Sequence, residues 1–258
     1  MERQPLDLRL SFDNAVSYRS ESQIARVVTE RWASDNLYCP NCIENLLHCL
    51  PYTKTKDFDC SRCEAQYQLK SQTKVISGSL MGAEYNTTLM SILAGCHPSM
   101  MIMRYAGEAK LVTDIQVIHR SYITESCLIP RTPLSGTARR AGWQGCLFSL
   151  DNIPKSAKID IVSSGIVAPR SAVQQQWKTI QRLLTQPAVA RGWTSDVLKV
   201  VDQLGQRFTL QQVYSHETEL SRLHPQNLNV KPKIRQQLQV LRDVGIVEFI
   251  GNGDYIRL

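Results

Sequence analysis

Three polar residues in the segment DFDCSRCEAQYQLKS, residues 57–71, have the types and spacing that phosphodiester hydrolysis requires. Asp57 precedes Gln68 by eleven positions, and Lys70 stands two positions further on. A carboxylate and an amide oxygen are hard ligands of the kind that Mg²⁺ binds, and a bound Mg²⁺ lowers the pKa of a coordinated water. A nearby lysine can orient or deprotonate that water, or stabilise charge on the phosphate. The pattern predicts a magnesium site at Asp57 and Gln68 with Lys70 as a catalytic residue.

The same segment predicts a β-hairpin that brings these residues together. Residues 56–59 enter a turn with the sequence CSRC, and residues 66–71 leave it. Side chains alternate along a strand, so Gln68 and Lys70 share a face about 7 Å apart. Asp57 can meet them across the strand pair. A half-solvated edge strand with alternating polar residues gives the same pattern, so that alternative stays open.

Four cysteines around the hairpin turn have the spacing of a zinc site. They form C-x2-C-x17-C-x2-C, within YCPNC at 38–42 and DCSRC at 59–63. Two such tight loops complete a tetrahedral four-sulfur site. Four protein ligands leave no position for a water, so we expect a structural zinc and not a catalytic one. A redox dithiol pair is the alternative. The expected zinc ligands are Cys39, Cys42, Cys60 and Cys63.

The stretch TARRAGWQGC, residues 137–146, is a candidate DNA contact. It places Arg139, Arg140 and Trp143 on one loop that contains a glycine. Arginines suit phosphate or guanine contacts, and an aromatic ring can wedge against bases. A buried tryptophan with surface arginines is the alternative interpretation.

The C-terminal part of the chain, residues 193–258, predicts a winged helix that follows a linker at 185–192. Helices are expected at 195–204, 210–223 and 232–244, and VEFIGNGDYIRL is expected to form two strands about a turn. Trp193 is a candidate apolar wall of the contact surface or a core residue. A winged helix that pairs with protein is the alternative. On the third helix, the residues expected to face outward and contact DNA are Lys233, Arg235, Gln236 and Gln239.

The N-terminal part of the chain, residues 1–184, is expected to form a mixed α/β domain. A helix is expected at 20–36, with Glu30 off its apolar stripe. We expect Glu30 to be solvated, and the alternative is a helix carboxylate that lies near the metals. A further helix at 83–94 and strands at 100–105 and 111–118 fit a central sheet flanked by helices.

The bulk composition indicates a soluble protein with a polyanion among its possible partners. The formal net charge is +7 and is spread over the chain, so it suits nucleic acid without requiring it. The N-terminal sequence MERQPLDLRL has no signal pattern, and no apolar run approaches membrane-spanning length. We therefore expect a cytoplasmic protein.

The whole chain resembles the DpnI-like methyl-directed type II restriction endonucleases. The resemblance rests on dense matches in SQIARVVTERW, YCPNC, DFDCSRC, LKS, TARRAGWQGC, RGWT and KIRQQLQVLRD. It implies an α/β fold, with a PD-(D/E)XK nuclease domain that holds a structural zinc and a C-terminal winged helix. It also implies Asp57 as the metal-binding aspartate and Lys70 as the catalytic lysine. Position 68 differs from the family pattern, which has a glutamate where this chain has Gln68.

The activity that the resemblance implies is Mg²⁺-dependent cleavage of double-stranded DNA at GATC sites that carry N6-methyladenine. The expected partner is that DNA, with no membrane and no obligate protein partner, and we expect a monomer. A non-cleaving methyl-DNA-binding protein is the first alternative, because Gln68 is neutral and divalent sites depend on ligand charge. A zinc-ribbon winged-helix transcription regulator is the second.

Overall fold

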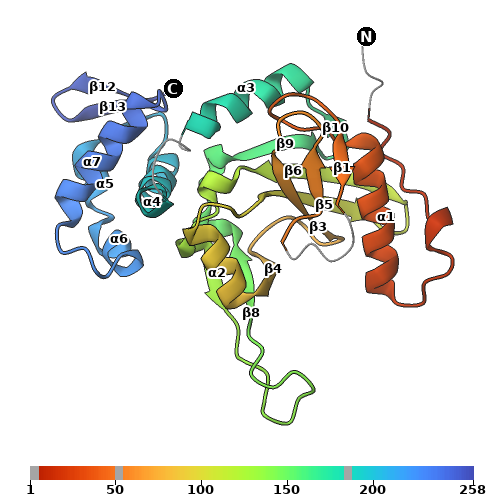
Figure 1. Cartoon of the computed structure of the whole chain (residues 1–258). Helices are drawn as coiled ribbons and strands as arrows, with labels where there is room; N and C mark the ends of the chain where they lie inside the picture. The colour runs from red at the N-terminus through yellow and green to blue at the C-terminus, as the bar shows by residue number, and fades with distance from the viewer. Residues whose placement is uncertain (1–5, 50–54, 183–187) are drawn as a thin grey trace. The chain divides into compact units, whose positions relative to one another are not determined.

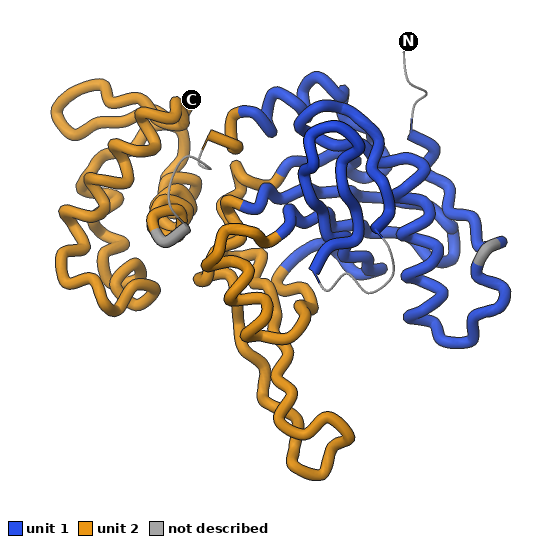
Figure 2. Tube along the Cα trace, in the orientation of Figure 1, with its two compact units in different colours: residues 1–77, 98–120, 159–178 blue, residues 78–97, 121–158, 179–258 orange. Residues whose placement is uncertain are grey.

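The computed structural model describes residues 6–49, 55–182 and 188–258 (Figure 1). Contacts group the chain into two compact units that do not follow chain order (Figure 2). Unit 1 comprises residues 1–77, 98–120 and 159–178, and unit 2 comprises residues 78–97, 121–158 and 179–258. The sequence-based division into 1–184 and 193–258 follows chain order and stays a prediction.

Unit 1 is built on a seven-stranded sheet with the order β1-β2-β3-β5-β6-β9-β10. Strand β3 runs parallel to β5, whereas β5 and β6 are antiparallel. The first five residues of β5, SMMIM, are all buried, as expected for a strand that is covered on both faces. Helix α1 (Glu21–Asn36) packs against β1 and β3. The strands are β1 (Leu46–His48), β2 (Phe58–Cys60), β3 (Gln66–Gln72), β5 (Ser99–Ala106), β6 (Leu111–Ile118), β9 (Lys158–Ser163) and β10 (Ile166–Val167).

Unit 2 contains a small sheet and the winged helix. The small sheet has the order β4-β8-β7, with β4 at Ser79–Glu84, β8 at Gly145–Ser149 and β7 at Leu128–Pro130. Its helix α2 (Tyr85–Leu93) is capped by the Glu84 carboxylate, which accepts hydrogen bonds from two backbone amides. Helix α3 (Arg170–Gln181) belongs mostly to unit 1, as does the 3-10 helix at Asp13–Ala15, and further short 3-10 helices lie at Arg120–Tyr122, Glu125–Cys127, Leu150–Asn152 and Lys155–Ala157.

The winged helix has one strand more than the sequence predicted. Its sheet has the order β11-β13-β12, in which β11 is only three residues long and lacks a strand pattern of its own. A capping box at Thr209 and Gln212 starts α5, as predicted. The elements are α4 (Ala188–Leu204), β11 (Arg207–Thr209), α5 (Leu210–Tyr214), α6 (Glu217–Leu223), α7 (Val230–Asp243), β12 (Val247–Gly251) and β13 (Asp254–Arg257).

Two predicted helix boundaries in this part of the chain are wrong. Helix α4 begins at Ala188 and not at Ser195, so residues 188–192 of the predicted linker are helical, and residues 185–187 lie outside the described residues. Gly192 suggested a break, but one glycine in a helix costs only about 1 kcal/mol, which neighbouring contacts outweigh. The helix predicted over 210–223 is divided into α5 and α6 at Ser215 and His216.

Helix α4 connects two parts of unit 2 through three polar residues at three-residue spacing, which we call the α4 seam. Each contacts one residue of the 121–158 segment and one residue of the winged helix. The contacts are Asp196 with Ser126 (2.8 Å) and His224 (2.8 Å), Lys199 with Asn152 (3.3 Å) and Glu219 (3.2 Å), and Asp202 with Ser156 (2.9 Å) and Arg257 (2.9 Å). Asp196 and Asp202 are buried, so hydrogen bonds must satisfy their carboxylates.

We expect Asp196→Ala to lower the free energy of unfolding by about 2–3 kcal/mol, because Ser126 and His224 lose a charged partner in a buried position. Urea denaturation measures the change. The matched control is Asp243→Ala, which removes an exposed carboxylate of α7 and should change stability by less than about 0.5 kcal/mol. Equal effects of the two substitutions would contradict a stabilising role for the seam.

Candidate functional site

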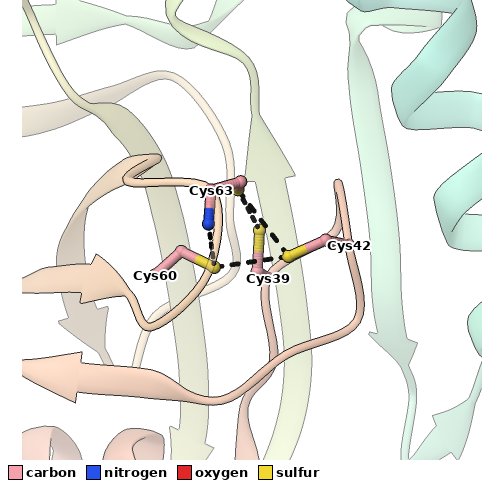
Figure 3. Close-up of side chains that lie close together, drawn as sticks. All are labelled: Cys39, Cys42, Cys60 and Cys63. Carbon is pink, nitrogen blue, oxygen red and sulfur yellow. Dashed lines mark hydrogen bonds between the residues drawn. The ribbon is translucent and has the colours of Figure 1, made fainter.

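The four cysteines of the predicted zinc site converge, as Figure 3 shows. Their sulfur atoms all lie within 4.8 Å of one another, and three pairs are 3.3–3.7 Å apart. A tetrahedral site with zinc–sulfur bonds of about 2.3 Å has sulfur–sulfur edges of about 3.8 Å. Disulfides would need sulfur atoms about 2.05 Å apart, and all four cysteines are free. The four sulfur atoms could therefore hold a structural zinc.

The backbone makes two similar turns around the sulfur atoms. Ile43 and Glu64 each directly follow the second cysteine of a pair, and both have left-handed φ angles, 64° and 58°. This conformation costs roughly 1–2 kcal/mol for a residue other than glycine, so other interactions must stabilise it. Burial opposes ionisation of Cys63, but hydrogen bonds from Asn41 and from the Ala65 amide lower the pKa of its thiol to about 7. Burial raises the pKa of the Cys39 and Cys42 thiols instead, so the four thiols of the cluster differ in how readily they ionise.

We expect Cys60→Ala to abolish zinc binding, because three sulfur atoms cannot complete the tetrahedral site. Elemental analysis of the purified protein should fall from about one zinc per chain towards zero, and thermal stability should fall with it. The control is Cys96→Ala, since Cys96 is exposed and lies outside the cluster. Full zinc content in Cys60→Ala would rule out the cluster as the metal site.

The hairpin predicted around the CSRC turn is confirmed. Phe58 pairs with Tyr67, and the same register extended by one residue places Asp57 opposite Gln68. The Asp57 amide donates to the Tyr67 carbonyl (2.9 Å), and the Asp57 carboxylate accepts a hydrogen bond from the Leu69 amide (2.8 Å). These two bonds hold the Asp57 carboxylate against the part of β3 that carries Gln68 and Lys70.

Charged groups from two elements, α1 and β3, surround Asp57. Burial raises the pKa of its carboxyl group above the usual range, and the negative charge of Glu30 raises it further. The Leu69 amide, Lys70 and Arg26 act in the opposite direction. Asp57 and Lys70 are therefore close enough to interact electrostatically, and Glu30 belongs to the same cluster.

The expectation that Glu30 is solvated is wrong. Its side chain is only 15% exposed, and its two oxygens contact Arg26 Nε (2.7 Å) and His48 Nε2 (3.0 Å). Arg26 lies one turn before Glu30 on α1, and that i, i+4 spacing was visible in the sequence. The contact with His48, a residue of β1, depends on how α1 packs on the sheet, and the sequence carries no local sign of it.

The candidate DNA-contacting loop lies between β7 and β8 and extends away from the small sheet (Figure 1). Arg139 and Arg140 are exposed, and the Arg140 guanidinium lies 4.6 Å from the centre of the Trp143 ring. Two backbone hydrogen bonds between Leu134 and the Gly142–Trp143 pair hold the loop narrow. Trp143 is half-buried, and Arg140 covers its ring. The indole is therefore neither fully buried nor fully exposed to solvent.

Helix α7 presents most of its predicted contact residues to solvent. Arg235, Gln236 and Gln239 are exposed, whereas Lys233 is half-buried and donates to Gln236 (2.8 Å). The opposite face, with Ile234, Leu238 and Leu241, is buried as predicted.

Two further residues show how α7 is fixed. Gln237 is 2% exposed and accepts a hydrogen bond from the Thr194 hydroxyl of α4 (2.6 Å), which the sequence did not indicate. Trp193 is 5% exposed and stacks on His224 with the ring centres 4.0 Å apart. Trp193 is therefore a core residue, in agreement with the second of its two predicted roles.

Two tyrosines lie beside the exposed basic side chains of α7. The charged ends of Lys231 and Arg235 each lie 5.7 Å from the centre of the Tyr214 ring. Burial raises the pKa of Tyr255, and the nearby Arg242 opposes that shift. Tyr214 comes from α5 and Tyr255 from the wing, so only the folded winged helix brings them to α7.

An α/β sheet with a four-cysteine cluster that could hold zinc, followed in the chain by a helix-turn-helix with a basic outer face, is typical of a DNA-binding protein. Residues 6–186 match the model of the Dam-replacing family, and residues 189–257 match that of the Dam-replacing HTH domain. The chain belongs to the Dam-replacing family of DpnI-like enzymes, as the resemblance predicted. Membership supports a methylation-dependent restriction enzyme that binds DNA through its helix-turn-helix.

A membrane-spanning segment is not found among the described helices, since none combines the required length with the required apolar character.

Proposed function

We propose that this chain is a type II restriction endonuclease that cleaves double-stranded DNA at GATC sites carrying N6-methyladenine, by Mg²⁺-assisted hydrolysis. The catalytic part of this proposal rests on the cluster of Asp57, Lys70 and Glu30 around the β2–β3 hairpin. This hairpin lies beside the two cysteine turns, residues 39–42 and 60–63, that we call the zinc knuckle. The PD-(D/E)XK assignment and the GATC target rest on the resemblance, and family membership supports the methyl dependence.

In the proposed mechanism, Asp57 and Gln68 would hold Mg²⁺, and Lys70 would orient or deprotonate the attacking water. Hard oxygen donors opposite each other on a strand pair fit Mg²⁺, which supplies charge neutralisation and a more acidic bound water. The Leu69 amide fixes the Asp57 carboxylate in position. Lys70 shares the face of Gln68, where its ammonium group can orient the water or stabilise charge on the phosphate.

Glu30 is the proposed source of the negative charge that Gln68 lacks. A glutamine offers a carbonyl oxygen but no charge, and the affinity of a divalent site depends on the number of charged ligands. Glu30 is close enough to Asp57 to raise the pKa of its carboxyl group, and Arg26 and His48 hold it in a defined position.

The proposed DNA contacts come from the β7–β8 loop and α7. Arg139 and Arg140 suit the phosphate backbone or guanine, and Trp143 offers an aromatic surface. On α7, Arg235, Gln236 and Gln239 are placed to reach base edges. N6-methylation leaves adenine one N6 hydrogen and adds an apolar group, so a reader needs an apolar contact beside the polar ones. We propose that a single chain makes these contacts as a monomer.

A second candidate function is methyl-DNA binding without cleavage. Gln68 favours it, because the residue replaces an expected charged ligand and could leave the Mg²⁺ site too weak for catalysis. A transcription regulator built from a zinc ribbon and a winged helix is the third candidate.

A plasmid assay with methylated and unmethylated GATC sites separates these functions. We expect Mg²⁺-dependent cleavage of the methylated plasmid only, whereas binding without cleavage would support the second candidate, and indifference to methylation would count against both. We expect Lys70→Ala to lower the cleavage rate at least about 100-fold, the scale of a lost acid–base or charge-stabilising group, with near-normal binding. The control Lys74→Ala changes an exposed lysine near the end of β3 and should cleave normally. Full activity in Lys70→Ala would refute the active-site assignment.

The charge hypothesis is tested by two single substitutions and their combination. Glu30→Gln should raise the Mg²⁺ concentration needed for half-maximal cleavage, and Gln68→Glu should lower it, because each changes the site by one charge. The double variant Glu30→Gln/Gln68→Glu should return towards the wild-type requirement. A double variant that needs as much Mg²⁺ as Glu30→Gln alone would show that Glu30 acts in some other way.

A further inference from the structure

Tyr67 contacts both the sulfur cluster and the candidate catalytic residues. Its hydroxyl oxygen lies 3.0 Å from Cys39 Sγ, and its carbonyl accepts the hydrogen bond from the Asp57 amide. Side chains alternate along β3, so Tyr67 faces the knuckle while its neighbour Gln68 faces the opposite side with Lys70. One residue of the sheet therefore touches the metal site through its side chain and Asp57 through its backbone.

The direction of the hydrogen bond follows from chemistry. A sulfur atom that binds zinc is a thiolate and carries no proton, whereas a phenol is protonated near neutral pH. The Tyr67 hydroxyl therefore donates to Cys39. Hydrogen bonds of this kind orient metal ligands, and their loss typically weakens metal binding 10–100-fold.

The Tyr67 side chain is held from more than one direction. It is fully buried, and its ring packs against the Trp177 ring at 6.1 Å between centres. Trp177 in turn makes an edge contact with the buried His119 ring at 4.6 Å. A side chain packed in this way cannot move without moving its strand.

We propose that Tyr67 is a positioning residue that couples the zinc knuckle to the candidate catalytic strand, so that the metal helps to fix Asp57 and Gln68 through this side chain in addition to the CSRC turn. The importance of that strand for cleavage rests on the proposed function, whereas the coupling does not. The knuckle then serves to set the register of the β2–β3 hairpin at Asp57 as well as to close its turn.

The experiment compares Tyr67→Phe with Tyr38→Phe. Tyr38 is equally buried and precedes Cys39, but its hydroxyl group has no hydrogen-bond partner in the described part of the chain, so its loss should change little. Zinc release to a chromogenic chelator is measured first. We expect Tyr67→Phe to release zinc about tenfold faster than the wild type, and Tyr38→Phe to match the wild type. Equal release rates in all three proteins would overturn the proposal.

The second readout is hydrogen exchange at the backbone amides of Asp57 and Leu69. Both amides donate to groups of the hairpin, so they report its register without any cleavage. We expect exchange at these amides to accelerate in Tyr67→Phe and in zinc-stripped wild type, but not in Tyr38→Phe. Faster zinc release with unchanged exchange at the two amides would show a purely local role for the hydroxyl and would also overturn the coupling.

The cleavage assay then separates this inference from the proposed function. In an active enzyme, Tyr67→Phe should need several-fold more Mg²⁺ for half-maximal cleavage, while Tyr38→Phe should not. If the wild-type protein does not cleave methylated DNA, the proposed function fails, and zinc release and amide exchange still decide the role of Tyr67.

Discussion

The alternation of side chains along β3 is the constraint on which the candidate site depends. Successive residues of a strand face opposite sides, so a shift of one residue in the β2–β3 pairing would exchange the two sets of side chains. Tyr67 would then leave the sulfur cluster, and Gln68 and Lys70 would leave Asp57. The pairing register is set by nearby sequence, because the CSRC turn that joins the two strands supplies two of the four sulfur atoms.

The amide at position 68, where the family has an acid, also affects the repulsion between carboxylates in the site. This effect is separate from the number of charged metal ligands. Asp57 is half-buried, and Glu30 already disfavours its ionised form. A glutamate opposite Asp57 would add a third carboxylate to this cluster, and like charges that share a site raise one another's pKa. The amide of Gln68 avoids that repulsion. In the proposed site, residue 68 and Glu30, which come from different elements, would therefore both act on the charge of Asp57.

The sequence predicted those features that depend on residues close together in the chain. The four-cysteine spacing, the hairpin, the capping box at Thr209 and the buried stripe of α7 are all local patterns, and the structure agrees with each. The features that were missed depend on packing between distant segments. His48 reaches Glu30 only when α1 lies on the sheet, and Gln237 is buried only because Thr194 faces it. Polar residues of this kind have no periodicity that distinguishes a buried partner from a solvated surface residue.

The interleaving of the two units has a consequence for how the protein can be made and divided. The chain passes from one unit to the other after residues 77, 97, 120, 158 and 178, so neither unit is a continuous stretch of sequence. The large sheet needs β9 beside β6, and all three strands of the small sheet precede β9 in the chain, so the ribosome synthesises them first. Folding of unit 1 must therefore wait for late-arriving sequence, and unit 1 cannot be encoded by one continuous gene fragment.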